Sequence, residues 1–406
     1  PGSRGGNDRP PVERTLDKNR RDGKVTADKK LKIGITCYPT YGGSGVLATE
    51  LGKQLAQIGH EVHFISYALP YRLKGFYRNV YFHEVHVSSY PLFEYQPYTL
   101  SLAVKMHEVV EEFGLDLLHV HYAIPHATSA WIAKEMLGLD HPIKVITTLH
   151  GTDITLVGQE ESFKSITRFS IEKSDGVTAV SHYLYNRTVL ELEIKKHIEI
   201  IPNFVDTELF KRSPERDCSR DLLSPDGSRV IIHISNMRPV KRLQDVIAVF
   251  ARVSHELKVR LVMVGDGPER SAAHRLAEEL GVGDRVVFLG AQESIASLLN
   301  CADVALQPSA TESFGLSNLE ALSTGVPVVG TRCGGPEEVV LEGECGFLSE
   351  VGDVREMSEN VIRLLTDQKL YDSFSRVARQ RVVDNFTIEK VTQLYVDFYR
   401  RILGAS

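Results

Sequence analysis

From residue 31 onward, short apolar runs rich in β-branched residues alternate with longer segments in which apolar residues recur at helical spacing. The first unit has an apolar run at 31–36, a helical segment containing Leu47, Leu51 and Leu55, and a second apolar run at 62–65. Strands that are joined through a helix pair in parallel, and a parallel sheet is buried on both faces. The alternation therefore predicts an α/β fold of parallel sheets covered by helices.

The alternation falls into two series, separated by a polar stretch. Residues 211–228 are rich in Arg, Asp, Ser and Pro, which is typical of a linker or a surface excursion. We therefore expect one α/β domain over 31–205 and a second over 206–387, followed by a helix over 388–402. Strands are predicted at 31–36, 62–65, 81–87, 117–121, 144–148, 176–180 and 198–201, and then at 230–235, 260–264, 285–289, 303–307 and 326–329.

The first 30 residues differ from the rest of the chain. They contain almost no large apolar side chains and carry nine Lys or Arg against five Asp or Glu, so we expect a disordered leader or a tag. Removing this net charge of +4 from the formal net charge of −6 leaves −10 for the remaining chain. This negative charge argues against a nucleic acid or an anionic membrane as the main partner.

Composition also restricts the class of protein. A length of 406 residues, with 42% hydrophobic and 25% charged residues, is typical of a globular enzyme with two domains. No apolar run is long enough to span a bilayer and no signal-peptide pattern opens the chain, so we expect a cytoplasmic protein. The five cysteines are scattered and form no C-x-x-C pair, which predicts reduced thiols and neither a disulfide framework nor a zinc site.

Two glutamates, Glu312 and Glu320, bracket a Phe-Gly-Leu step where a predicted strand gives way to a helix. The first N–H groups of a helix lack intrahelical partners, so Phe314, Gly315 and Leu316 could hold a diphosphate. Glu320, in the helix, could accept the hydroxyls of a ribose, while Glu312 stays in the loop and faces a hexose. The alternative is that both are solvated acids at the positive end of a helix.

The spacing of these glutamates resembles the E-x7-E motif of the retaining glycosyltransferases of family 4, and the resemblance extends over residues 31–402. It implies the GT-B fold, in which two Rossmann-like domains face each other across a cleft. The first domain would then bind the acceptor and the second the UDP-sugar, and the helix over 388–402 would cross back to the first domain.

A glycine-rich loop, Tyr41 to Gly45, follows the first predicted strand. It lacks the G-x-G-x-x-G spacing, and no acidic residue ends the second strand, so a dinucleotide site is disfavoured. The glycines could simply form a tight turn. The resemblance instead places Gly43 and Ser44 in the cleft, against the donor phosphates and the acceptor.

Histidines occur at the ends of two predicted strands. His119 and His121 share one strand face, but no carboxylate or cysteine accompanies them, which favours core histidines over metal ligands. His150 resembles the family histidine that contacts the donor hexose near its anomeric carbon. Asp153 could orient that histidine, contact a sugar hydroxyl or cap a helix.

A basic cluster follows the strand predicted at 230–235. Cations at this position could neutralise a departing diphosphate, although such clusters are usually solvated. Lys241 matches the phosphate-binding lysine of the family, whereas Asn236 stands where the family has an arginine and Arg238 comes two places later. The resemblance also assigns Gly265 and Gln292 to the nucleotide side of the cleft.

The resemblance implies a mechanism without an enzyme nucleophile. The acceptor hydroxyl would attack on the face from which UDP leaves, with His150, Glu312, Lys241 and Arg238 as the catalytic group. The chain has no Asp-x-Asp pair, the motif with which another class of transferases holds a divalent ion. We therefore expect neither a metal nor another cofactor.

Four stretches, at 33–39, 42–45, 118–126 and 147–154, resemble the family members of the bacillithiol pathway. This closer resemblance implies UDP-N-acetylglucosamine as the donor and the hydroxyl of L-malate as the acceptor. A small dicarboxylate needs several hydrogen-bond donors, and the residues expected to bind it are Ser44, Tyr122, Thr148 and Asn236.

Alternatives remain open at this point. A transferase of the same fold could use inositol, a lipid or a glycan as acceptor, and a non-catalytic module could bind a UDP-sugar without turnover. The aromatic-rich segment 80–98 could form a homodimer surface or line the acceptor side.

Overall fold

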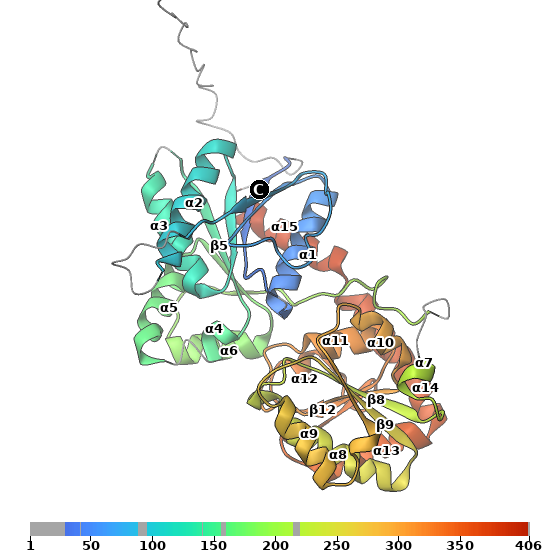
Figure 1. Ribbon diagram of the computed structural model, residues 1–406. Coiled ribbons are helices and arrows are strands. Elements are labelled where there is room, and N and C mark those ends of the chain that lie inside the picture. Colours follow the sequence, from blue (N-terminus) through green and yellow to red (C-terminus); the bar gives the residue numbers. More distant parts are fainter. Residues whose placement is uncertain are drawn as a thin grey trace, which may run out of the picture.

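The computed structural model describes residues 29–404, apart from 41, 88–95, 140, 156–159 and 214–219. The expected leader over 1–30 therefore falls almost wholly outside the described residues, as does the centre of the aromatic-rich segment 80–98. The described residues form two lobes, each built around a parallel sheet (Figure 1). The prediction of an α/β fold is confirmed.

Both sheets have a strand order that reverses beside their first strand. The first sheet has the order β3-β2-β1-β4-β5-β6-β7 and the second the order β10-β9-β8-β11-β12-β13. Ligands of such sheets bind beyond the carboxyl ends of the strands at the point of reversal. In each lobe that point faces the other lobe. The strands are β1 (Lys32–Thr36), β2 (Glu61–Ser66), β3 (Val80–Glu84), β4 (Leu117–His121), β5 (Lys144–Leu149), β6 (Gly176–Ala179), β7 (Glu199–Ile200), β8 (Arg229–Ile234), β9 (Val259–Val264), β10 (Val286–Gly290), β11 (Val304–Gln307), β12 (Val328–Thr331) and β13 (Gly346–Ser349).

Twelve of these strands match predicted ones, and β13 was missed. Its sequence is Gly-Phe-Leu-Ser, and it follows directly on a tight turn closed by a bridge between Glu342 and Gly346. It contains no β-branched residue, and runs rich in such residues were the signal by which the other strands were recognised.

Helices cover both faces of each sheet, as continuous apolar strands require. On the first sheet α2 and α3 pack on one face, and α1 and α15 on the other. On the second sheet α8, α9 and α13 lie opposite α10, α11 and α14. The helices are α1 (Gly43–Gln57), α2 (Tyr98–Phe113), α3 (Thr128–Leu137), α4 (Thr152–Thr155), α5 (Glu161–Lys173), α6 (His182–Leu192), α7 (Arg220–Leu223), α8 (Leu243–Glu256), α9 (Arg270–Glu279), α10 (Ile295–Cys301), α11 (Leu316–Ser323), α12 (Pro336–Val339), α13 (Val354–Thr366), α14 (Gln368–Asn385) and α15 (Ile388–Ile402), with short turns η2 (Ala123–Ala127), η4 (Pro239–Lys241) and η5 (Gly283–Arg285).

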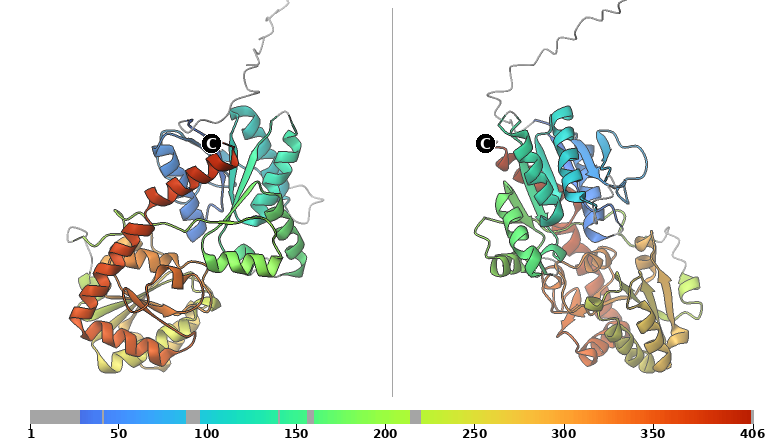
Figure 2. Two further views of the ribbon diagram at one scale, coloured as in Figure 1. Left: turned by 180° about the vertical axis from the view of Figure 1, so that it is seen from behind. Right: turned by 60° about the vertical axis from the view of Figure 1, so that its left-hand side comes forward.

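The last helix, α15, passes from the C-terminal lobe back to the N-terminal lobe (Figure 2). Its Tyr399 is fully buried, and the hydroxyl lies 2.7 Å from Nδ1 of His119 in β4. Gly176 in β6 leaves room for α15, because a Cβ at this position would lie only 2.8 Å from Cζ of Phe398 in that helix. The core of the N-terminal lobe is thus completed by α15.

Two expectations from composition can be compared with the structure. Within the described part of the chain, no helix has both the length and the apolar character needed to cross a bilayer. Cys37, Cys333 and Cys345 are free and buried. Cys301 is disulfide-bonded, so the prediction of reduced thiols is wrong for this residue.

Candidate active site

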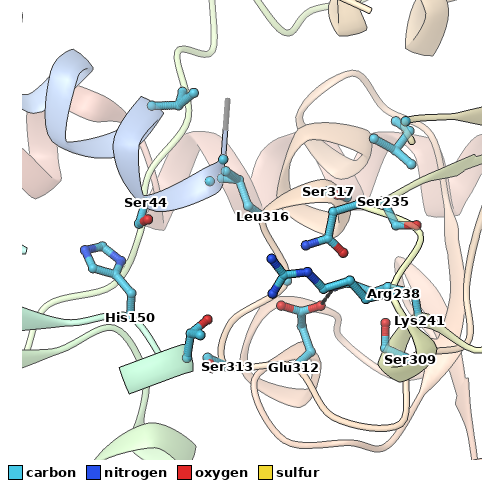
Figure 3. Close-up of a pocket in the computed structure, with 18 of the residues that line it drawn as sticks. Ser44, His150, Ser235, Arg238, Lys241, Ser309, Glu312, Ser313, Leu316 and Ser317 are labelled. Carbon is cyan, nitrogen blue, oxygen red and sulfur yellow. Dashed lines mark hydrogen bonds and ion pairs between the residues drawn. The ribbon is translucent and has the colours of Figure 1, made fainter. Parts of the chain in front are cut away.

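A cavity of about 790 Å³ opens between the two lobes, at the carboxyl ends of both sheets (Figure 3). Glu312, Glu320 and Lys241 line it from the C-terminal lobe, and His150 lines it from the N-terminal lobe. The predicted residues among its described lining are Gly43, Ser44, Tyr122, His150, Asn236, Arg238, Lys241, Gly265, Glu312, Gly315, Leu316 and Glu320.

Three predicted residues, Thr148, Gln292 and Phe314, do not line the cavity, because their side chains are used inside their own lobes. Thr148 is fully buried, and its hydroxyl lies 2.7 Å from both Nε2 of His119 and the hydroxyl of Thr178. The Gln292 amide donates to the carbonyl oxygen of Leu289 at 2.8 Å, and the Phe314 ring is buried in the core beneath α11.

The loop after β11 presents Glu312 to Lys241. Its backbone is fixed by the loop after β12, since Glu312 N–H donates to the carbonyl of Cys333 and its own carbonyl accepts from Gly335 N–H. Lys241, in the turn η4, donates to Oε2 of Glu312. Both side chains are mostly covered, with 18% and 25% of their surface exposed. The pair therefore places a carboxylate and an ammonium group side by side in the cavity wall.

Arg238 lines the same cavity, three residues before Lys241 in the chain (Figure 3). Its side chain is exposed and forms no hydrogen bond or ion pair with another described residue. A guanidinium group without a protein partner can accept an anion in a bidentate manner.

The N-terminal ends of α1 and α11 meet across the cavity. Gly315 precedes α11 with a φ of 93°, a left-handed conformation that glycine adopts without strain. A Cβ on Gly43, at the start of α1, would lie 3.5 Å from the Leu316 side chain, so the two helix ends are in close contact. Both direct free N–H groups and a positive dipole end toward the same space.

Glu320, in the second turn of α11, also lines the cavity. Burial raises its pKa to about 7, and the positive charge of Arg72 acts in the opposite direction. Arg72 lies in the loop after β2 and also contacts Glu50, with 3.8 Å between Nη1 and Oε1. The sequence contained no pattern that indicated Arg72. The strand-end rule could have found Gln307 and Ser309, which follow β11 into the lining.

His150 directly follows β5, and its Nε2 lies 2.8 Å from Nδ1 of His121 in β4. Burial lowers the pKa of His150 to about 3, so its imidazole is neutral at neutral pH. Asp153 accepts the backbone N–H groups of Ala123 and Gly151, both at 3.0 Å. Asp153 therefore fixes the loop that carries His150, although burial raises its own pKa to about 6.

Tyr122 joins the acceptor side of the cavity to the glycine-rich loop. Its φ of 84° is uncommon for a residue other than glycine, and such backbone strain is frequent at functional sites. Its hydroxyl lies 2.7 Å from the Ser44 hydroxyl. The strand end and the start of α1 are therefore linked directly.

The N-terminus of α6 links the N-terminal lobe to the loop that carries Glu312. The N–H groups of His182 and Tyr183 donate to the carboxylate of Glu338 in α12, at 2.9 and 2.8 Å. The Ser181 hydroxyl donates to the carbonyl of Ser313 at 2.6 Å. These contacts join the N-terminal lobe to α12 and to the loop that carries Glu312.

The buried histidines bind neighbouring side chains. The rings of His119 and His121 are hydrogen-bonded to Tyr399, Thr148 and His150. No group of three or more His, Cys, Asp or Glu residues in the described ranges is arranged to hold a metal ion. The expectation that catalysis needs no metal stays a prediction.

Comparison with known proteins gives the family. The chain matches the models of Glycosyltransferase Family 4 over residues 41–209 and of Glycosyl transferases group 1 over residues 215–381. It is 48% identical over 374 residues to the N-acetyl-alpha-D-glucosaminyl L-malate synthase of Bacillus anthracis, covering 92% of this chain and 98% of that protein.

Two solved structures share the fold at 21% identity. They are a glycosyltransferase of Rickettsia africae, with a TM-score of 0.78 over 93% of this chain and 100% of that one, and Anabaena HepE in complex with UDP-glucose, with a TM-score of 0.77 over 91% and 99%. The chain is therefore a glycosyltransferase with the GT-B fold, and it belongs to family 4 together with the Bacillus anthracis N-acetyl-alpha-D-glucosaminyl L-malate synthase.

Proposed function

We propose that this protein transfers N-acetylglucosamine from UDP-N-acetylglucosamine to the hydroxyl of L-malate, with retention at the anomeric carbon, as the first step of bacillithiol biosynthesis. One observation carries the proposal. A chain 48% identical to a malate synthase over nearly its whole length brings His150, Lys241, Glu312 and Glu320 to a single cavity between its lobes.

The C-terminal lobe would hold the donor. The first N–H groups of α11, with Lys241 and Arg238, supply positive potential for the diphosphate. Glu320 accepts the ribose hydroxyls, while Glu312 and His150 contact the hexose from opposite sides of the cavity. Phe314 enters this set only through its main chain, because its ring is buried in the core.

In the transfer step, the malate hydroxyl oxygen forms a bond to the anomeric carbon as the bond from that carbon to the phosphate oxygen breaks. The hydroxyl proton passes to the departing phosphate oxygen on the same face. Lys241 and Arg238 stabilise the charge that develops on UDP, which is catalysis by positioning and electrostatics.

The N-terminal lobe would hold malate. Ser44 and Tyr122 offer hydroxyl groups, Asn236 offers an amide from across the cavity, and Arg238 adds a positive charge for a carboxylate. Thr148 is left out of this set because it is buried behind the cavity wall.

The experiment is an incubation of the purified protein with UDP-N-acetylglucosamine and L-malate, followed by NMR of the anomeric proton. We expect release of UDP together with an α-linked product. A product formed with inositol, a lipid or a glycan but not with malate would reject the proposed acceptor. Binding of UDP without turnover of any acceptor would support the non-catalytic module.

We further propose that transfer needs no metal ion, because cationic side chains and a helix end provide the positive charge around the diphosphate. We expect the transfer rate to stay within about twofold when EDTA is added and when Mg²⁺ is restored. A loss that Mg²⁺ or Mn²⁺ reverses would contradict this expectation.

A further inference from the structure

A cluster of histidines lies at the cavity wall and directly behind it. His119 and His121 in β4 and His126 in η2 are buried, and His150, which follows β5, lines the cavity. Burial lowers the pKa of each of them, to about 3 for His119 and His150 and to about 4 for His126. All four imidazoles are therefore neutral at neutral pH, and each has one N–H donor and one acceptor nitrogen.

The contacts of the cluster restrict where the protons lie. His126 Nδ1 is 2.6 Å from the carbonyl oxygen of His121, which can only accept, so His126 carries its proton on Nδ1. Both nitrogens of His119 face hydroxyl groups, those of Tyr399 and Thr148, at 2.7 Å. His121 and His150 bond each other, with Nδ1 of His121 lying 2.8 Å from Nε2 of His150.

Either His121 or His150 could donate the proton in this bond, and the surroundings of Nε2 of His121 show which of them does. It is buried and has no hydrogen-bond partner among the described residues. If His150 were the donor, the His121 proton would lie on Nε2 as a buried N–H group without an acceptor. If His121 donates from Nδ1, only a lone pair is left unpaired, and orphaned buried N–H groups are the rarer of the two.

We infer that His121 is a positioning residue, which donates from Nδ1 to Nε2 of His150 and thereby holds the proton of His150 on Nδ1. Figure 3 shows the His150 imidazole at the cavity beside Ser44 and opposite the residues of the C-terminal lobe. The nitrogen not bound to His121 is then a fixed N–H donor, suited to a hydroxyl oxygen of the donor hexose. The inference rests on the proposed function, in which His150 contacts that sugar.

Three variants test this role. His121→Phe keeps a planar ring and removes both nitrogens, so His150 can adopt either tautomer. His121→Asn places an amide N–H near the position of Nδ1 and restores the donor. His126→Phe is the matched control, because it makes the same exchange in the same cluster at a residue that does not bond His150.

We expect kcat for transfer to fall about 10- to 100-fold in His121→Phe. In His121→Asn kcat should stay within about tenfold of the wild-type value, and in His126→Phe within about threefold. ¹⁵N NMR of labelled histidine should show the His150 proton on Nδ1 in the wild type and in His121→Asn, and a mixture of tautomers in His121→Phe. Equal losses of kcat in both Phe variants would overturn the inference.

An unchanged His150 spectrum in His121→Phe would also overturn it. The NMR measurement needs no acceptor, so it separates this inference from the choice of malate. If the wild type forms no product with malate but its His150 spectrum responds to His121→Phe as expected, the proposed acceptor fails and the inference stands.

Discussion

Replacement of Glu312 with Ala is expected to lower kcat/KM for transfer by at least about 100-fold, the size of effect seen when one group that stabilises a transition state is removed. Two effects act together. The cavity loses the carboxylate that would position the hexose, and Lys241 loses the partner that holds its ammonium group in the cavity wall. Steady-state kinetics with UDP-N-acetylglucosamine and malate measures the result.

The controls separate these two effects. Lys241→Ala should also lower kcat, and the double variant should lose less than the sum of the single losses in free energy, because the two side chains are in contact. Glu344→Ala removes an exposed glutamate of the same lobe outside the described cavity lining and should leave kcat/KM within about twofold. Near-normal transfer by Glu312→Ala would reject the assignment of the sugar site.

The fold could be predicted because its signal is local. Strands buried on both faces are continuous apolar runs, and β4, in which every residue is buried, was predicted with its observed bounds. The break between strand and helix at 308–316 follows from the same reasoning, which is why Glu312 lies in a loop and Glu320 in α11. β13, which contains no β-branched residue, shows where a local signal fails.

Site residues could be predicted only where they belong to a motif that the sequence displays. Thr148 follows a strand pattern whose alternate residues face opposite sides, and the sequence did not show which side faces the cavity. Arg72, and the contact between Glu338 and α6, depend on how segments far apart in the chain meet. Such contacts arise from the packing of whole lobes, which a single sequence does not display.

The second large effect is expected for Glu320→Gln, which should weaken UDP binding about 10- to 100-fold. A carboxylate that accepts two ribose hydroxyls is replaced by an amide that can accept only through its oxygen. Calorimetric titration with UDP measures the loss. Glu50→Gln is the matched control, because Glu50 contacts Arg72 but lies outside the described lining of the large cavity.

The same exchange should stabilise the free protein above neutral pH. Burial raises the pKa of Glu320 from 4.5 to about 7, so the folded protein holds this proton more tightly than the unfolded chain does. As pH rises from 4.5 through 7, the wild type loses free energy of unfolding relative to Glu320→Gln, and below pH 4.5 the difference disappears. Thermal melts at pH 8 should therefore show a higher Tm for the variant than for the wild type. At pH 5 the difference in Tm between the two proteins should be smaller.

A residue that lowers stability and raises affinity for the ligand is expected where burial of a charge serves binding. In the wild type, UDP affinity should rise with pH through about 7 as Glu320 ionises, and in Glu320→Gln this rise should be absent. Comparing the two proteins at each pH cancels the titration of the UDP phosphate itself. Equal affinities of the two proteins at pH 8 would show that Glu320 is a solvated acid at a helix, the alternative that its sequence position left open.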